Sequence, residues 1–419
     1  MNRLAISRAA NLAMFLFLVV LSWCFKASYF SFAVAIFIIF LLCDIWYSYR
    51  NHEKIFPDVS RPFKYMAGAI FSLYILFILT AIFHFDGQDV HKAIEYAYLS
   101  IPFFMTWWIS AKYSVSQGVR WGILVGAIIA CVIGLHQWCI NPGIRIESSY
   151  AHPNHFGTMI NLTLPLIGYY AVHVKNNAYK ILSVCTMIVQ LGCLYLTGSR
   201  GALLALIGAV VLGMLWAYVS LREYKNIRFS KYACVFIILI LIGGGFTLYH
   251  MGQERNLDVV RMAETGDSVA KAGGERMQMI RASIAMWEDH KLFGVGAGHW
   301  GEAYYGQYRP SDIHEEGHSM PHNMPLFFLS TGGLVGVAGY CIFIILSIVA
   351  LTKVVKMGRS LKWGIAVYMI FLSFFLQGLV DTTIINKIPA RMYFAIMGCI
   401  VTLSASRLIA NSEIKQLRE

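Results

Sequence analysis

The sequence predicts an all-α, polytopic membrane protein with about twelve transmembrane helices and one long polar loop. Of its 419 residues, 58% are hydrophobic and only 13% are charged, whereas a soluble domain carries about 25% charged residues. The mean hydropathy is +0.60, and apolar runs long enough to cross a bilayer recur along the chain. This composition excludes an ordinary soluble enzyme, a disordered chain and a disulfide scaffold. We therefore expect a single polytopic domain over residues 1–419.

Twelve apolar runs are candidate spans. Each is expected to be helical, because a backbone in lipid must satisfy its hydrogen bonds internally. The first two runs nearly merge around Lys26, and the fourth contains Glu95 and Pro102. The expected spans cover residues 11–25, 30–47, 65–84, 93–111, 120–140, 155–174, 180–197, 201–221, 232–250, 324–351, 362–382 and 391–410.

The positive charges indicate how the chain is oriented. Most of the 34 Lys and Arg residues fall in connections that an alternating path places on the same side as both termini. Short cytoplasmic loops carry this excess, so both termini are expected in the cytoplasm and the long loop 251–323 in the bacterial periplasm. The net charge of +12 is explained by this bias, without a nucleic-acid partner.

Polar residues gather on the expected periplasmic side. The loop 251–323 is the only extended polar stretch, and loops of that length are usually functional. Three further clusters reach the same side, at residues 145–155, 197–201 and 381–391. The apolar spans are nearly free of charge. That argues against a flippase-like or ion-coupled transporter, whose ionisable residues lie near the midplane.

The TGSRG junction at residues 197–201 is typical of an anion site. Ser199 can cap the next helix, whose free N–H groups favour an anion. Arg200 adds a permanent charge and a bidentate fork suited to phosphate oxygens. The alternative is an arginine that reaches the lipid headgroups.

The segment 275–289 has helical spacing. An apolar stripe would place Arg276 and Arg281 on its opposite borders, so a surface helix could hold both toward a lipid-linked phosphate. The alternative is anchoring to anionic lipid. The stripe consists of Met277, Ile280, Ile284 and Trp287.

Two histidine patterns follow in the long loop. His314-Glu315-x-x-His318 matches the zincin motif, which requires a helix, but Gly317 lies inside it and favours a turn. A membrane zinc protease is kept as a remote alternative. His322, at the start of the tenth span, can act as a general base because an ordinary histidine has a pKa of about 6.5. Its alternative is a helix-start histidine bonded locally.

Taken together, these motifs resemble the O-antigen ligase family of bacterial inner-membrane glycosyltransferases. The resemblance covers roughly residues 145–340. It rests on HPN at 152–154, TGSRGA at 197–202, the run from Glu275 to KLFGVGAG, and His322-Asn323 followed after nine residues by Gly333-Leu334-Val335-Gly336. It implies the helical fold of C-type glycosyltransferases, with no metal ion or other cofactor.

The implied reaction transfers a glycan from undecaprenyl diphosphate to an acceptor hydroxyl, inverting the anomeric centre. In ligases the acceptor is a sugar of the lipid A core. The HN-x9-GxxG spacing and the lack of a second long periplasmic loop favour a ligase. An O-antigen polymerase and a protein O-oligosaccharyltransferase remain alternatives. The expected partners are the carrier-linked donor, the lipid A-core acceptor and membrane lipid.

The resemblance also implies roles for individual residues. His322 would be the general base. Arg200 and Arg276 would bind the donor diphosphate, with Arg261 and Arg281 as further candidates. The residues expected to shape the site are Arg145, His152, Asn154 and Asn323.

Overall fold

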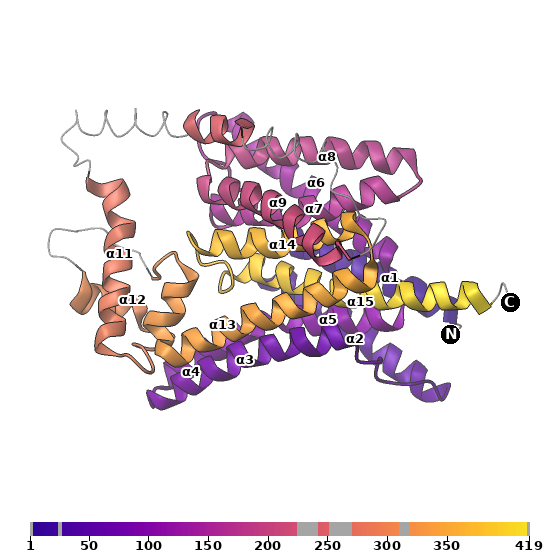
Figure 1. Cartoon of the computed structure of the whole chain (residues 1–419), viewed down its shortest axis with the longest axis horizontal. Coiled ribbons are helices and arrows are strands. Elements are labelled where there is room, and N and C mark those ends of the chain that lie inside the picture. The colour runs from indigo at the N-terminus through magenta and orange to yellow at the C-terminus, as the bar shows by residue number, and fades with distance from the viewer. Residues whose placement is uncertain (1–2, 24–26, 224–241, 251–269, 310–318, 417–419) are drawn as a thin grey trace.

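The computed structural model describes residues 3–23, 27–223, 242–250, 270–309 and 319–416, and within these ranges it contains helices and no strands (Figure 1). The helices are α1 (Arg3–Trp23), α2 (Ala27–Arg50), α3 (Arg61–Phe83), α4 (Gly87–Tyr98), α5 (Ile101–Lys112), α6 (Ser116–Ile140), α7 (Pro153–His173), α8 (Asn177–Leu196), α9 (Arg200–Leu221), α11 (Ala270–Asp289), α12 (Trp300–Ala303), the π-helix η1 (Tyr304–Tyr308), α13 (Met324–Gly358), α14 (Leu361–Gly378) and α15 (Lys387–Gln416).

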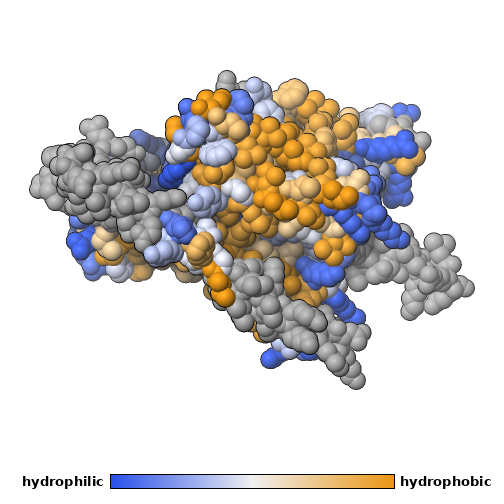
Figure 2. Space-filling model, turned by 90° about the horizontal axis from the view of Figure 1, so that it is seen from above, coloured by the Kyte–Doolittle hydropathy of each residue, from blue (hydrophilic) through white to orange (hydrophobic). Residues whose placement is uncertain are grey.

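Within the described ranges, eight helices are long and apolar enough to cross a membrane. They are α1, α3, α6, α8, α9, α13, α14 and residues Tyr29–Arg50 of α2. Helix α7 packs beside α8 and α14, and α15 packs beside α5. Figure 2 shows hydrophobic residues over the middle of the visible face and hydrophilic residues toward its ends. The all-α, polytopic class is thus confirmed, while twelve spans remain a prediction.

The expected fourth span, residues 93–111, is wrong as one helix. It is divided between α4 and α5, which end and begin on either side of Leu99 and Ser100. Pro102 lies in the first turn of α5, where its missing N–H costs nothing, whereas inside a continuous helix it would break a hydrogen bond. Of the expected ninth span, only residues 242–250 are described, and they are helical.

Small residues bring the helices close together. Gly118, Gly122 and Gly126 recur every four residues along α6 and lie against α1. A Cβ at Gly122 would lie 3.0 Å from the carbonyl oxygen of Phe15. Such spacing lets helices pack tightly in lipid, where no hydrophobic effect drives them together.

A buried ion pair joins α2 to α5. The Asp44 carboxylate is fully buried and accepts hydrogen bonds from Lys112 Nζ at 2.8 Å and from Trp108 Nε1 at 2.9 Å. Lys112 Nζ also donates to the Ser48 hydroxyl at 2.8 Å. Because each charge satisfies the other, neither is left unpaired in the apolar interior.

Helix α13 is broken near its start, and another segment docks into the break. Gly333 has φ 61° and ψ −154°, outside the helical region. Residues 291–296 pair with the exposed backbone. Val295 N donates to Ser330 O at 2.8 Å and Leu334 N to Lys291 O at 2.9 Å. The break therefore fixes the segment that follows α11 against the bundle.

The polar elements lie at one end of the bundle. In Figure 1, α1 begins and α15 ends on the right, whereas α11 and α12 lie on the left. This arrangement agrees with the alternating path inferred from the sequence, because it places the region 270–309 opposite the chain ends. The assignment of that end to the periplasm remains a prediction.

Candidate active site

A polar pocket of about 790 Å³ lies where α7 and α9 begin. It is lined by the ends of α6 and α14, the α6–α7 connection, the start of α7, the α8–α9 junction, α11 and the connection after α14. Three of its side chains are arginines, Arg145, Arg200 and Arg276, and one is the carboxylate Asp381. The fold thus brings together charged residues that lie far apart in the sequence.

The α8–α9 junction has the geometry that its sequence predicts. Ser199 is the N-cap of α9, and its hydroxyl accepts a hydrogen bond from Ala202 N at 3.4 Å. Gly198 has φ 60°, and a Cβ there would lie 3.0 Å from Arg145 Nε. Arg200, the first residue of α9, therefore lines the pocket beside helix N–H groups that favour an anion.

Asn154 connects three segments that meet beside the pocket: the α6–α7 connection, the α8–α9 junction and the end of α14. Its side-chain oxygen accepts hydrogen bonds from Ser199 Oγ at 2.8 Å and Arg145 Nη2 at 3.4 Å, and its carbonyl accepts one from Gln377 Nε2 at 3.1 Å. Arg145 Nε donates to Thr197 O at 2.8 Å. These contacts hold the segments around the pocket together, and the site-shaping role of Arg145 and Asn154 remains a prediction.

His152 caps α7. Its Nδ1 accepts a hydrogen bond from Asn154 N at 3.1 Å, which requires that nitrogen to be unprotonated. Burial lowers the pKa of His152, and the nearby Arg145 lowers it further. The ring is therefore neutral at neutral pH and contributes to the pocket as a helix cap.

His322 lies against Asp381. The distance from His322 Nδ1 to Asp381 Oδ1 is 3.2 Å; the carboxylate is buried, and the imidazole is 32% exposed. Burial alone would raise the pKa of Asp381. The hydrogen bond and charge of His322, with the N–H of Thr382, outweigh burial and lower it. Because an ionised carboxylate only accepts hydrogen bonds, His322 Nδ1 carries a proton in this contact, and in the neutral ring the lone pair is then on Nε2.

The backbone around His322 is held in an unusual conformation. His322 has φ 49°, a left-handed conformation that costs a non-glycine residue about 1–2 kcal/mol. Asn323 caps α13 by accepting from Leu326 N at 2.9 Å, and its Nδ2 donates to Leu379 O at 2.8 Å. Asn323 thus ties His322 to the connection that carries Asp381. The sequence also allowed a histidine that bonds only to nearby residues, but Asp381 is 59 residues away along the chain.

Helix α11 is present, but the expected apolar stripe is not the face that packs inside the protein, and its contact with the membrane surface remains a prediction. Met277 is 50% exposed and Ile284 is 38% exposed. The buried face consists of Met279, Ala282, Ser283 and Met286. It packs on Trp300 and Tyr304, and Trp300 Nε1 donates to Ser283 Oγ at 3.1 Å.

The sequence alone allows either of these two faces of α11 to be the buried one, because Met and Ile occur at neighbouring positions along the helix. The aromatic residues that decide between them belong to α12 and η1. Both arginines of α11 are exposed. Arg276 lines the polar pocket, and Arg281 is not among the described residues that line it.

Several predicted residues lie outside the described part of the chain. They are Arg261 and the zincin-like residues His314, Glu315 and His318. Among the residues that are described, no group of three or more His, Cys, Asp or Glu side chains could hold a metal ion. A candidate functional residue that sequence reasoning did not single out is Asp381, whose proximity to His322 depends on the packing of α13 beside α14.

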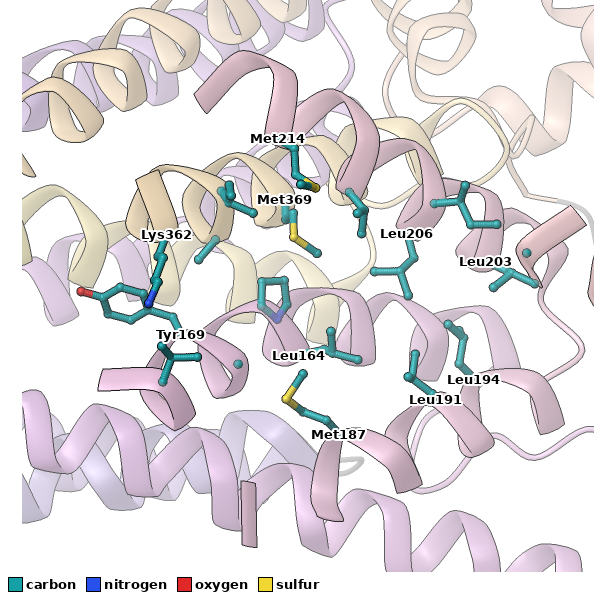
Figure 3. Close-up of a pocket in the computed structure, with 18 of the residues that line it drawn as sticks. Leu164, Tyr169, Met187, Leu191, Leu194, Leu203, Leu206, Met214, Lys362 and Met369 are labelled. Atoms are coloured by element: carbon teal, nitrogen blue, oxygen red, sulfur yellow. The ribbon is translucent and has the colours of Figure 1, made fainter. Parts of the chain in front are cut away.

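An apolar groove of about 850 Å³ adjoins the polar pocket (Figure 3). Residues of α7, α8, α9 and α14 line it, and Tyr195 lines both cavities. Its lining is dominated by leucine and methionine side chains, with Lys362 and Tyr169 at one end. The cationic pocket and the apolar groove therefore lie side by side, with Tyr195 between them.

Comparison with known proteins agrees with the motifs. Residues 185–341 match a family model described as O-Antigen ligase. No curated protein matches the chain. The matched range includes the α8–α9 junction, α11, the segment docked into α13, His322 and the α13 break.

Proposed function

Because residues 185–341 match a family model described as O-Antigen ligase, we propose that the protein is an O-antigen ligase. The proposed donor is a glycan on undecaprenyl diphosphate, and the proposed acceptor is a sugar hydroxyl of the lipid A core. The reaction would take place at the periplasmic face of the bacterial inner membrane. A membrane glycosyltransferase of this kind needs sites for a diphosphate, a polyprenyl chain and an attacking hydroxyl.

The observation that carries the proposal is the polar pocket with its adjoining apolar groove. Arg145, Arg200 and Arg276 reach the pocket from three separate segments, and the groove meets it at Tyr195. A diphosphate is a double anion that arginine forks bind well. A polyprenyl chain lies in the bilayer, and an apolar groove can accept it without the cost of burying an unpaired polar group. The pair of cavities therefore matches both parts of the proposed donor.

The leaving group needs stabilisation more than it needs protonation. As the bond from the anomeric carbon to the diphosphate oxygen breaks, that oxygen takes the electron pair. Arg200 and Arg276 are proposed to stabilise the charge that develops there, because fixed cations beside a reacting group lower the barrier. Arg261 and Arg281 remain further candidates from the sequence.

The attacking hydroxyl needs a base, and His322 is the proposed one. The acceptor oxygen forms the new bond to the anomeric carbon from the face opposite the diphosphate, which inverts that centre. Its proton passes to His322 Nε2, the nitrogen that has the lone pair when the neutral ring donates from Nδ1 to Asp381. Asp381 then stabilises the imidazolium, a role that carboxylates take beside catalytic histidines. Arg145, His152, Asn154 and Asn323 are proposed to shape the pocket.

A deletion strain tests the proposal against its nearest alternatives. A ligase predicts core lipopolysaccharide without long chains, together with accumulation of full-length polymer on its carrier. A polymerase predicts single repeats on the core instead. Normal lipopolysaccharide combined with loss of glycan from proteins would indicate a protein O-oligosaccharyltransferase. Either of the last two results would overturn the ligase assignment.

A further inference from the structure

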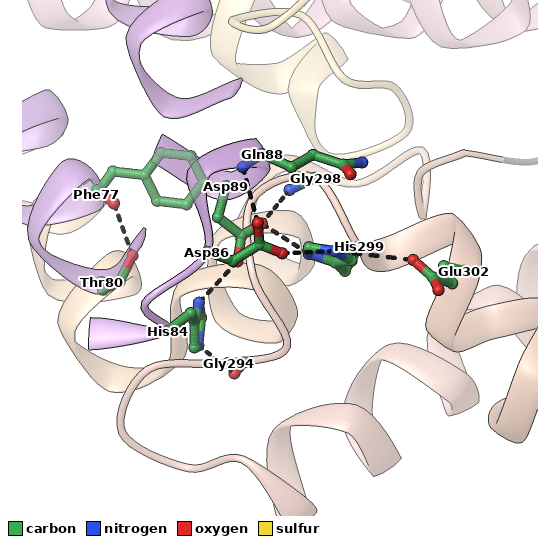
Figure 4. Close-up of polar contacts among 10 residues, drawn as sticks. All are labelled: Phe77, Thr80, His84, Asp86, Gln88, Asp89, Gly294, Gly298, His299 and Glu302. Carbon is green, nitrogen blue, oxygen red and sulfur yellow. Dashed lines mark hydrogen bonds and ion pairs between the residues drawn. The ribbon is translucent and has the colours of Figure 1, made fainter. Parts of the chain in front are cut away.

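A second polar cluster joins the α3–α4 corner to the segment after α11 (Figure 4). At its centre is Asp89 in the first turn of α4, whose side chain is 1% exposed. Its carboxylate contacts His84 Nδ1 at 2.9 Å and His299 Nδ1 at 2.9 Å, and it accepts a hydrogen bond from Gly298 N at 2.8 Å. A Cβ at Gly296 would overlap this carboxylate. We call these contacts the Asp89 clamp.

Both nitrogens of each histidine face acceptors. His84 Nε2 lies 3.1 Å from Gly294 O, and His299 Nε2 lies 3.1 Å from Asp86 Oδ2. A neutral imidazole carries a single N–H, whereas an imidazolium carries two. The four histidine contacts can therefore all be hydrogen bonds only when both rings are protonated.

Among the described residues, the side chains that form ion pairs with the two rings are carboxylates. His84 faces Asp89 and Asp86, and His299 faces Asp89, Asp86 and, at 3.8 Å, Glu302. The hydrogen bond to Asp89 raises the pKa of His84, and this outweighs the opposing effect of burial. Burial would raise the pKa of Asp89, but its bonds to His84, Gly298 and His299 lower it.

The direction of the pH dependence follows from these shifts. A raised histidine pKa stabilises the folded clamp below the ordinary value of about 6.5, and this contribution is lost as pH rises through the folded-state pKa. A lowered aspartate pKa stabilises it above about 4, and that contribution is lost only in stronger acid. The clamp should thus be complete in mild acid and weaken in alkali.

The clamp is connected to the polar pocket through α11. His299 directly precedes α12, whose Trp300 packs with Tyr304 on the buried face of α11. Arg276 lies near the other end of α11, about 20 Å from Asp289 at about 1.5 Å per residue. A tilt of about 3° at the anchored end would move Arg276 by about 1 Å, and a displacement of that size can cost about 10²-fold in rate.

We propose that Asp89 is a positioning residue, which holds α11 through His84 and His299 so that Arg276 faces the donor site, and that protonation of His84 strengthens its hold. The role of Arg276 in binding donor rests on the proposed function. The clamp and its pH dependence do not, and they can be measured without donor.

The experiment measures the distance between two spin labels on the full-length protein in lipid nanodiscs. The labels replace Met277 on α11 and Ile144 on the pocket wall, both at least half exposed, with the nine native cysteines changed to serine. Electron–electron double resonance is recorded at pH 5.5 and pH 9. Asp89→Asn is compared with Asp58→Asn, a matched change at an exposed ion pair on another loop.

The proposal predicts a narrow distance distribution at pH 5.5 that broadens at pH 9 in the parent protein and in Asp58→Asn. Asp89→Asn should be broad at both values. If Asp89→Asn does not fold, His84→Gln is used, and its broadening between the two pH values should be smaller than that of the parent. A distribution independent of pH in the parent, or an Asp89→Asn distribution as narrow as the parent's, would overturn the proposal.

Donor binding separates this outcome from that of the proposed function. Retention of undecaprenyl-diphosphate glycan is measured in the His322→Ala background, so that titration of the proposed base does not contribute. Weakening by about tenfold or more in Asp89→Asn is expected if α11 carries a donor ligand. If the label distances respond as predicted but no donor binds the parent protein, the proposed function fails and the clamp stands.

Discussion

Replacing Gly333 with alanine should release the segment docked into the break of α13. Gly333 has φ 61° and ψ −154°, a region essentially restricted to glycine, and a side chain there costs about 1–3 kcal/mol. Its Cβ would also overlap the carbonyl group of Leu292. The substitution therefore strains both the α13 backbone and the docked segment.

The hydrogen bonds beside Gly333 set the remaining cost. Leu334 N donates to Lys291 O at 2.9 Å and Val335 N to Leu292 O at 3.2 Å. Each contributes about 0.5–1.5 kcal/mol net, so the total cost is about 2–6 kcal/mol. Because about 1.4 kcal/mol corresponds to a factor of ten, local opening should increase by roughly 30-fold or more.

Amide hydrogen exchange measures this opening directly in the purified full-length protein. The amides of Val295, Leu334 and Val335 should exchange at least about 30-fold faster in Gly333→Ala. Gly192→Ala on α8 is the control, because nothing lies within 4 Å of its added Cβ. Unchanged exchange at these amides in Gly333→Ala would refute the proposed docking.

Three further predictions concern charge, orientation and stability. Arg200→Lys should lose transfer activity almost as severely as Arg200→Ala, since lysine lacks the bidentate fork; near-normal activity would support contact with lipid headgroups instead. A cysteine replacing Phe85, which is 93% exposed, should react with an impermeant thiol reagent added from the periplasm, and one replacing Arg359 should not; reversed labelling would contradict the orientation. Asp44→Ala should destabilise the protein by about 3–5 kcal/mol, because it leaves the mostly buried Lys112 without its charge partner. Asp58→Ala, at an exposed ion pair, should cost about 0–1 kcal/mol. Equal melting temperatures of the two variants would refute this.

The parts predicted best from sequence are those set by local chemistry. The cap at Ser199 follows from a serine between a glycine and an apolar run, and the structure confirms it. The helical class follows from the apolar composition. The resemblance to the O-antigen ligase family follows from short motifs whose order along the chain is preserved, and the family model that matches residues 185–341 supports it.

What sequence reasoning missed depends on contacts between distant segments. The buried face of α11 is chosen by Trp300 and Tyr304, so its own periodicity could not decide between two registers. The fourth span looked continuous because its apolar composition continues across the Leu99–Ser100 break. Asp381 reaches His322 across 59 residues of sequence, and no local pattern indicates such a partner.

The most direct test of the account compares transfer with donor retention in His322→Ala. Purified protein is given carrier-linked glycan and core acceptor, and both the product and the bound donor are measured. We expect transfer to fall by about 10²–10⁴-fold, the usual contribution of a general base, while donor binding stays near that of the unaltered protein because the arginines remain. Asp381→Asn, which cannot stabilise the imidazolium as a carboxylate does, should lose transfer with the same retention of donor. Transfer near the wild-type rate in His322→Ala, or loss of donor binding as complete as in Arg200→Ala, would contradict the assignment of His322 as the base.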